Sequence, residues 1–270
     1  MPSSDSLFVG SIPDLYDRLL VPLIFQPYAE DVSRRVAALA PRRVLETAAG
    51  TGVVTRELSR ALPAGVDLVA TDLNQPMLDR AAAVGTAGPV GWQQADAQAL
   101  PFDDSSFDVV ACQFGVMFFP DKAKAFSEAR RVLRPGGAFA FNVWDGLADN
   151  DFARLVEEAL AMVFPVDPPG FFGRIPHGYH DRAAIAADLL SGGFVGEPSF
   201  ETVTFRSRAA SPLEAATALC QGTPLRNELE SRSGATLAEA TAACADAIAE
   251  TFGDGRVDGK IQAQIVVVRS

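Results

Sequence analysis

The sequence has few lysines, histidines and cysteines, and each shortage excludes a class of function. Lysine occurs only three times, at Lys122, Lys124 and Lys260, and 34 acidic residues against 23 basic ones give a formal net charge of −11 at pH 7. A surface that binds the phosphate backbone of a nucleic acid is normally basic. The composition therefore predicts a protein without a nucleic-acid partner.

Cysteine and long apolar runs are equally scarce. Cys112, Cys220 and Cys244 lie far apart in apolar settings, which predicts buried thiols of a reducing compartment rather than a disulfide framework or a metal cluster. The first residues lack a basic segment followed by an apolar one, and no apolar run approaches the roughly 20 residues that span a bilayer. We therefore expect a soluble, cytoplasmic protein with no membrane partner and no metal.

Hydrophobic residues make up 48% of the 270, enough for one large α/β domain with an elaboration or for two small domains. From residue 42 to 144, short β-branched runs alternate with segments of helical period, which is typical of a mostly parallel sheet. The predicted strands are 42–46, 66–72, 90–96, 107–119 (ending in a loop) and 138–144, and the predicted helices are 51–62, 74–84 and 121–133.

After residue 144 this alternation loosens. The later predicted elements are helices at 151–164, 181–193 and two or three within 211–252, strands at 199–207 and 260–270, and a Pro/Gly/aromatic segment at 165–180. We expect a single domain over 1–270. Its predicted parts are N-terminal lid helices (1–40), a cofactor-binding core (41–145), cap or substrate elements (146–180 and 207–256) and the remaining core (181–206 and 257–270).

Polar or small residues follow each of the first four strands, and ligands of open parallel sheets bind beyond these strand ends. They are Glu46 with the turn from Ala48 to Gly52, Asp72, Asp96 with Ala97, and Gln113 with Phe114. A glycine-rich turn is weak evidence by itself, because such turns serve several kinds of nucleotide.

Glu46 narrows the choice of ligand. A carboxylate at this position would repel a pyrophosphate at the helix N-terminus, but it suits an ammonium group. Asp72 is placed to accept hydrogen bonds from both ribose hydroxyls. Asp96 and the backbone N–H that follows it could bind an adenine edge. The implied ligand carries an amine, a ribose and an adenine, and no phosphate.

Four segments, "VLETAAGTG", "VATDLNQPML", "QADAQALPFDDSSFDVV" and "EARRVLRPGGAFAFNVW", resemble the successive motifs of class I S-adenosylmethionine-dependent methyltransferases. The branch they resemble most is the ubiquinone/menaquinone-biosynthesis-like, or methyltransferase type 11, small-molecule group, over about residues 40 to 145. The resemblance implies a Rossmann-like, mostly parallel seven-stranded sheet with helices on both faces, plus a helical cap and N-terminal lid helices. It also implies S-adenosylmethionine as cofactor and S-adenosylhomocysteine as product.

The resemblance also implies roles for particular residues. It puts Gly50 and Gly52 beside the methionine part of the cofactor and Gln113 with Phe114 near the transferable methyl. The full cofactor-binding set is Glu46, Ala48, Gly50, Gly52, Asp72, Leu73, Asp96, Ala97, Gln113 and Phe114. The family usually has glycine where this chain has Ala48, and alanine disfavours a positive φ, so we expect a slightly shifted turn.

The acceptor side is less defined. The predicted substrate or lid residues are Tyr16, Phe25, Tyr28, Met117, Phe171 and Phe172. Aromatic faces can attract a sulfonium, although an N-terminal helix face packed on the core explains Tyr16, Phe25 and Tyr28 equally well. His177 and His180 are the candidate general bases, and the alternative is that they lie on an exposed loop.

Methyl transfer can proceed chiefly through alignment of the reactants, so a base is not required. The predicted function is methyl transfer to a small, partly hydrophobic acceptor. Two alternatives stay open: a non-catalytic regulatory protein that binds S-adenosylmethionine, and a nicotinamide-dependent oxidoreductase, which Glu46 disfavours. The sequence leaves the methylated atom, the acceptor and the oligomeric state open, and a homodimer is one possibility.

Overall fold

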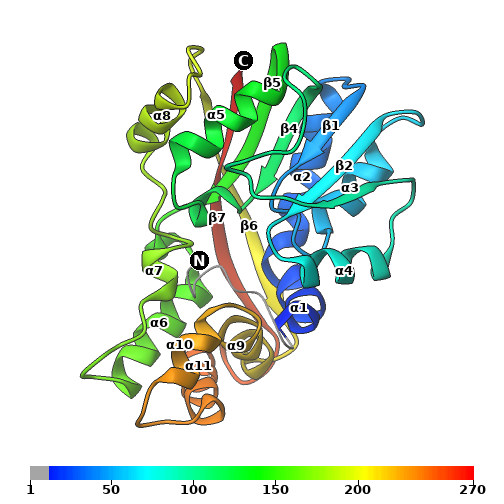
Figure 1. The fold of residues 1–270 in the computed structure, drawn as a ribbon. Helices are drawn as coiled ribbons and strands as arrows, with labels where there is room; N and C mark the ends of the chain where they lie inside the picture. Colours follow the sequence, from blue (N-terminus) through cyan, green and yellow to red (C-terminus); the bar gives the residue numbers. More distant parts are fainter. Residues whose placement is uncertain (1–11) are drawn as a thin grey trace. The chain divides into compact units, whose positions relative to one another are not determined.

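A computed structural model describes residues 12–270, and its centre is a seven-stranded sheet in the order β3-β2-β1-β4-β5-β7-β6 (Figure 1). The strands are β1 (Arg43–Glu46), β2 (Asp67–Asp72), β3 (Gly91–Gln94), β4 (Phe107–Gln113), β5 (Leu133–Trp144), β6 (Ser199–Ala209) and β7 (Val257–Arg269). The pairs from β3 to β5 are parallel and β5 pairs with β7 in the antiparallel sense. The predicted seven-stranded, mostly parallel α/β fold is confirmed.

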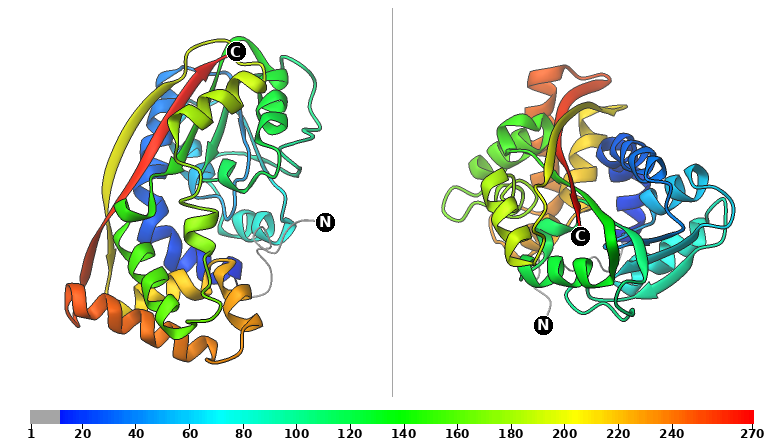
Figure 2. Two further views of the ribbon diagram at one scale, coloured as in Figure 1. Left: turned by 90° about the vertical axis from the view of Figure 1, so that its left-hand side faces the viewer. Right: turned by 90° about the horizontal axis from the view of Figure 1, so that it is seen from above.

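Helices α3, α4 and α5 follow β1, β2 and β4, as the alternating pattern between residues 42 and 144 predicts, and the full set of helices is longer. They are α1 (Ile12–Leu15), η2 (Tyr16–Phe25), α2 (Gln26–Ala38), α3 (Val53–Ala61), α4 (Gln75–Val84), η3 (Val116–Phe118), α5 (Lys122–Val132), η4 (Leu147–Asp149), α6 (Asp151–Val163), α7 (Phe171–Arg174), α8 (Arg182–Ser191), α9 (Pro212–Gln221), α10 (Leu225–Ser231) and α11 (Leu237–Phe252). Helices α2 and α3 cover one face of the sheet and α5 and α8 the other (Figure 2).

The chain divides into two compact units. One contains residues 26–144, 179–203 and 263–270, and therefore β1 to β5 with their helices. The other contains the described residues up to Phe25, together with 145–178 and 204–262. The segments predicted as a cap fall almost entirely in this second unit, and the prediction of a single domain over 1–270 stays a prediction.

The N-terminal helical prediction over 12–40 agrees with the chain from Ile12 to Ala38. Its middle part, η2, follows the wider π pattern of hydrogen bonds and contains Pro22, which has no N–H to donate. Residues 1–11 of the predicted lid lie outside the described residues.

Strand β5 begins five residues earlier than predicted, at Leu133 instead of residue 138. Leu133 pairs with Phe107 and Ala138 with Val109, so residues 134–137 bulge out opposite Asp108 alone. Pro135, Gly136 and Gly137 fall between the predicted helix (121–133) and the predicted strand (138–144), and in the structure they form a bulge within the strand.

Candidate functional site

The turn between β1 and α3 brings backbone close to the carboxyl ends of the strands. Ala48, Gly50 and Gly52 all have positive φ, at 53°, 57° and 81°. The N–H of Ala49 donates to the carbonyl of Thr71 at 2.9 Å, which ties the turn to β2. A Cβ on Gly52 would lie 3.0 Å from the Cβ of Ala81, so this position needs glycine for its conformation and also for its packing.

Ala48 is accommodated by a glycine that the sequence interpretation did not include. A Cβ on Gly115 would lie 2.5 Å from the Cβ of Ala48 and 2.7 Å from Sγ of Cys112. The missing side chain at Gly115 therefore makes room for the extra methyl group of Ala48. Alanine takes the left-handed conformation here, and the positive φ values of Gly50 and Gly52 are kept beside it. The lone glycine that follows β4 was the available signal of this close approach.

Glu46, the last residue of β1, is a buried carboxyl group. Only 1% of its surface is exposed, and Oε2 accepts a 2.6 Å hydrogen bond from the hydroxyl of Thr55 on α3. Burial raises its pKa to about 8; the Thr55 bond opposes the shift, nearby Asp72 adds to it, and Arg56 lowers it. At neutral pH the site therefore holds a protonated acid that a cation could ionise.

Asp72, the last residue of β2, connects the strand end to the turn. Its Oδ2 accepts from the N–H of Gly50 and its Oδ1 from the N–H of Asn74, both at 2.8 Å. Burial raises the pKa of this carboxyl group, and the two backbone bonds oppose the shift. Leu73 beside it is 42% exposed. The structure thus brings Glu46, Gly50 and Asp72 together.

Asp96 and Ala97 lie in a turn just after β3, and both are half-buried. Oδ1 of Asp96 accepts from the N–H of Gln98 at 2.8 Å, and Oε1 of Gln98 accepts from the N–H of Asp121. These bonds join the turn to the start of α5. The residues therefore stand at the same edge of the sheet as Asp72, since β2 and β3 are parallel.

Gln113 is the last residue of β4, and Phe114 follows it with the unusual φ of 52°. Its N–H donates to both oxygens of Asn142, the carbonyl at 3.2 Å and Oδ1 at 2.9 Å. Its ring stacks on Trp144 with centroids 3.8 Å apart, and the edge of Tyr28 meets the Phe114 ring at 5.2 Å. Sequence reasoning missed Asn142, because the contact depends on the register between β4 and β5.

The predicted lid and substrate residues occupy several places. Tyr28 is fully buried and donates from its hydroxyl to the carbonyl of Val203 at 3.0 Å, and Met117 is buried in η3. In the other unit, Tyr16 stacks on Phe25 with centroids 5.1 Å apart. Phe171 and Phe172 are both buried in α7 of that unit, with ring centroids 5.4 Å apart.

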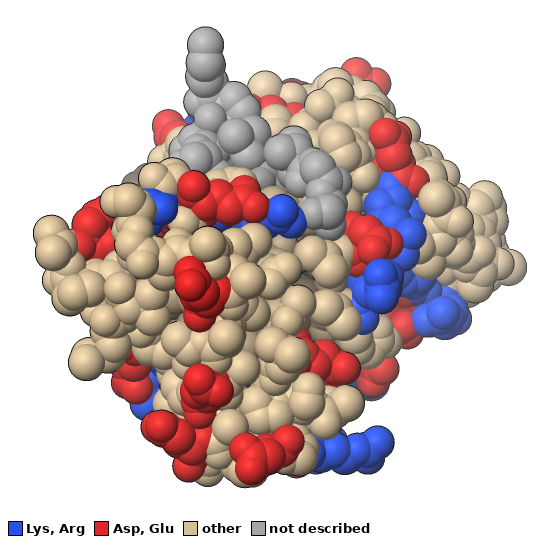
Figure 3. Space-filling model, turned by 90° about the horizontal axis from the view of Figure 1, so that it is seen from below, with Lys and Arg blue, Asp and Glu red and all other residues tan. Residues whose placement is uncertain are grey.

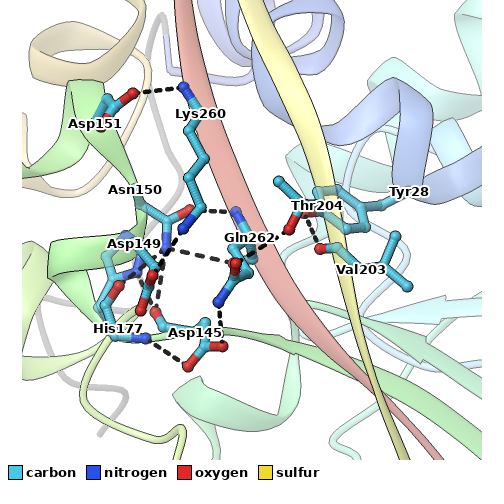
Figure 4. Close-up of polar contacts among 11 residues, drawn as sticks. Tyr28, Asp145, Asp149, Asn150, Asp151, His177, Val203, Thr204, Lys260 and Gln262 are labelled. Carbon is cyan, nitrogen blue, oxygen red and sulfur yellow. Dashed lines mark hydrogen bonds and ion pairs between the residues drawn. The ribbon is translucent and has the colours of Figure 1, made fainter.

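The two histidines differ in their surroundings. His177 is 5% exposed, and its Nδ1 lies 2.8 Å from the carbonyl oxygen of Asp145, within a polar network that includes Asn150 and Gln262 (Figure 4). Because a carbonyl oxygen only accepts, Nδ1 carries the proton in this contact. His180 is exposed, as the loop alternative predicted.

On the face shown in Figure 3, acidic side chains are widely spread and basic ones gather mainly at one side. Between residues 12 and 270, no group of three or more His, Cys, Asp and Glu side chains could hold a metal ion. Over the same residues, no helix combines the length and the apolar character that crossing a membrane requires.

A family model described as a methyltransferase domain matches residues 45–141, which contain all of these strand ends. The chain is 36% identical over 185 residues to the demethylmenaquinone methyltransferase of Deinococcus radiodurans, and the match covers 68% of each protein. It is 43% identical over 99 residues to a ubiquinone/menaquinone biosynthesis C-methyltransferase of Idiomarina loihiensis, covering 35% of this chain and 39% of that protein.

Several such matches are partial: the chain spans 39% to 62% of the length of other curated relatives. Among solved structures, the [4+2]-cyclase SpnF superposes with a TM-score of 0.58 at 19% identity, covering 100% of this chain and 97% of that chain. At this identity the likeness shows the fold alone. The family model, the Deinococcus relative and the strand-end geometry agree, and the chain belongs to the class I S-adenosylmethionine-dependent methyltransferases of the ubiquinone/menaquinone-biosynthesis type.

Proposed function

We propose that this protein transfers a methyl group from S-adenosylmethionine to a small, partly hydrophobic acceptor by in-line displacement. The observation that carries the proposal is the pair of buried acids, Glu46 and Asp72, on either side of a turn with three positive φ values. A buried carboxyl group without an ion-pair partner costs folding free energy, so this pair is better explained by a ligand than by the fold.

The chemistry of these groups fits the cofactor part by part. Glu46 would take the ammonium group, and Asp72, held by the N–H of Gly50, would accept from the ribose hydroxyls. Asp96 and the N–H of Ala97 would bind the adenine edge. Leu73, with its exposed side chain, would cover one adenine face. Ala48, Gly50 and Gly52 would allow the backbone to approach the methionine part.

When bound, S-adenosylmethionine supplies an electrophilic methyl group on a positively charged sulfur. The protein then accelerates the reaction chiefly by holding the cofactor and the acceptor in line, since aligning two reactants lowers the activation barrier by roughly 7–11 kcal/mol. Gln113 and Phe114 would face the methyl group, and the rigid stack of Phe114 on Trp144 keeps this end of β4 in one conformation. We propose that Tyr28 and Met117, in the unit that holds Phe114, contact the acceptor. Tyr16, Phe25, Phe171 and Phe172 belong to the other unit, and their role as substrate or lid residues stays a prediction.

A general base would add about 10²- to 10⁴-fold to the rate for an acceptor that must lose a proton. His177 is the better candidate of the two histidines, because the contact of Nδ1 with the carbonyl oxygen of Asp145 holds its ring in one orientation. The relatives' names point to quinone-type rings, so reduced benzoquinones and naphthoquinones are the acceptors to test first.

Two measurements test the function. Calorimetry should show S-adenosylmethionine binding and no NADH binding; tight binding of NADH alone would refute the assignment. S-adenosylhomocysteine should then form with at least one acceptor of a panel of phenols, quinols, amines and thiols. Binding without turnover across that panel would favour a regulatory protein, and the fold shared with a cyclase makes the turnover measurement necessary.

We further propose that the protein works in the cytoplasm, with no nucleic-acid partner, no membrane partner and no metal. Its three cysteines are all buried free thiols, which suits a reducing compartment. Light scattering after size exclusion would decide whether it forms the homodimer that the sequence left open.

A further inference from the structure

The bulge at the start of β5 forms a hollow at the opposite end of the sheet from the strand-end site. Residues 134–137 lie opposite Asp108 alone, and the hollow between this bulge and the α2–β1 connection measures about 340 Å³. Gly137 is required in this geometry, because a Cβ there would lie 2.9 Å from the carbonyl oxygen of Arg134. Figure 1 shows the end of β7 beside the start of β5, where this bulge lies.

Three arginines and one acid line the hollow. They are Arg42 before β1, Arg134 in the bulge, Arg269 at the end of β7, and Asp108 in β4. The net charge of the chain is −11, but the three guanidinium groups outnumber Asp108 and give this hollow a local excess of positive charge.

Both carboxylate oxygens of Asp108 accept hydrogen bonds from other groups of the protein. Its Oδ2 accepts from the backbone N–H groups of Arg42 and Arg43, both at 2.8 Å, and its Oδ1 accepts from Nη1 of Arg134 at 2.6 Å. Burial alone would raise the pKa of this carboxyl group, but these bonds outweigh burial and lower it. Asp108 therefore stays ionised and fixes Arg134 in place.

The positive charges of the other two arginines, Arg42 and Arg269, are available to a ligand. The guanidinium of Arg42 is exposed, and no carboxylate lies within ion-pair distance of it among residues 12–270. Arg269 is exposed as well and donates from Nη1 to the carbonyl of Gly136 at 3.1 Å, and both residues line the hollow. Between these charges the lining includes Leu39, which is half-buried, and Pro41 and Val109, which are buried.

We propose that this hollow binds a small oxyanion, a phosphate or carboxylate group carrying a short apolar body, through the guanidinium groups of Arg42, Arg134 and Arg269. Guanidinium groups bind both anions in paired, charge-assisted hydrogen bonds. Leu39, which is half-buried, provides the apolar contact for that body. The site is separate from the cofactor chemistry and does not depend on the methyl-transfer proposal.

Calorimetry at constant ionic strength tests this site with two probes, phenyl phosphate and benzoate, which share the ring and differ in the anion. We expect saturable one-to-one binding of at least one probe, and the preferred probe identifies the anion. The double variant Arg42→Gln/Arg269→Gln should bind it at least tenfold more weakly. Both side chains are exposed, so the variant should fold, which circular dichroism checks.

The control is the double variant Arg154→Gln/Arg226→Gln, which removes the same charge from two helix-surface pairs in the other unit. It should bind within twofold of the unaltered protein, and so should Asp72→Ala, which alters the opposite end of the sheet. Equal weakening in the control would show that the probe senses overall charge only, and the proposal would be wrong. Absence of saturable binding to either probe would overturn it as well.

Discussion

Glu46 should make the binding of S-adenosylmethionine depend on pH, with a proton released for each cofactor bound. Its carboxyl group has a pKa of about 8, chiefly because burial disfavours the charged form. If the ionised group pairs with the ammonium of the cofactor, binding must remove the proton that the free protein holds at neutral pH. The groups that act on Glu46 are Thr55, Asp72 and Arg56.

The size of the effect follows from that pKa. At pH 7 about nine-tenths of Glu46 is protonated, so about 0.9 proton should leave for each cofactor bound. Between pH 5.5 and 7 the ionised fraction rises about 30-fold, and the association constant should rise by about the same factor. An α-amine has a pKa of roughly 7.7–8.0, so the cofactor keeps its positive charge over this range.

Calorimetry in two buffers of different ionisation enthalpy measures the protons released directly. Glu46→Gln is the matched variant, because the glutamine oxygen can still accept the Thr55 hydroxyl while the side chain no longer ionises. This variant should bind S-adenosylmethionine more weakly at pH 7 and show a flat affinity between pH 5.5 and 7.

Two results would refute the reasoning. If the unaltered protein releases no proton at pH 7, then Glu46 either does not pair with the amine or is already ionised. If Glu46→Gln retains the rise in affinity with pH, another group is responsible. Asp72 would then be the next candidate, since burial raises the pKa of that carboxyl group too.

Three further substitutions test other contacts. Asp72→Ala should weaken S-adenosylmethionine binding at least tenfold by calorimetry, through loss of about 1.5–3 kcal/mol per charge-assisted bond; unchanged affinity would remove it from the ribose site. Gly115→Ala should lower the free energy of unfolding by about 1–3 kcal/mol in urea titrations, because its new Cβ would lie 2.5 Å from the Cβ of Ala48. Adding Ala48→Gly to the same chain should restore part of that free energy. If Gly115→Ala costs the same free energy with and without Ala48, the two side chains are not in contact. The asparagine of His177→Asn can still donate to the carbonyl oxygen that Nδ1 contacts, but it has no basic nitrogen, so kcat should fall about 10²-fold or more. The control His180→Asn should change kcat little. Similar kcat values in the two variants would show that neither histidine acts as a base and that catalysis depends on alignment of the reactants.

The sequence predicted the parallel half of the fold well because its signals are local. Alternating apolar runs and helical periods mark the elements between residues 42 and 144, and parallel strands necessarily end at one edge. Glu46 and Asp72 could therefore be assigned to one site without coordinates. The start of β5 was misplaced because Pro135 and Gly136 are turn signals whether a chain leaves a sheet or only bulges from it.

The contacts that complete the site could not be predicted in the same way. Thr55 meets Glu46 because the first turn of α3 lies over the end of β1, and Asn142 meets Phe114 because of the register of two strands. Both depend on packing distances, which periodicity does not contain. A lone glycine after a strand, Gly115, is a weak sequence signal of a close contact. It does not identify the partner, because Ala48 lies 67 positions earlier in the sequence.

The cost of Glu46 to the fold is itself an argument for its role. An unfolded glutamate ionises near pH 4.5, so at pH 7 folding must put a proton on this side chain, which costs about 3 kcal/mol. Glutamine would accept the same Thr55 bond without that cost. Structural ion pairs also shift pKa values, but among residues 12–270 Glu46 has no ion-pair partner, and the charge interaction with Arg56 only partly offsets the effect of burial on its pKa. A destabilising acid beside a glycine-rich turn is explained if a cation offsets the cost when it binds, and the ammonium group of the cofactor is such a cation.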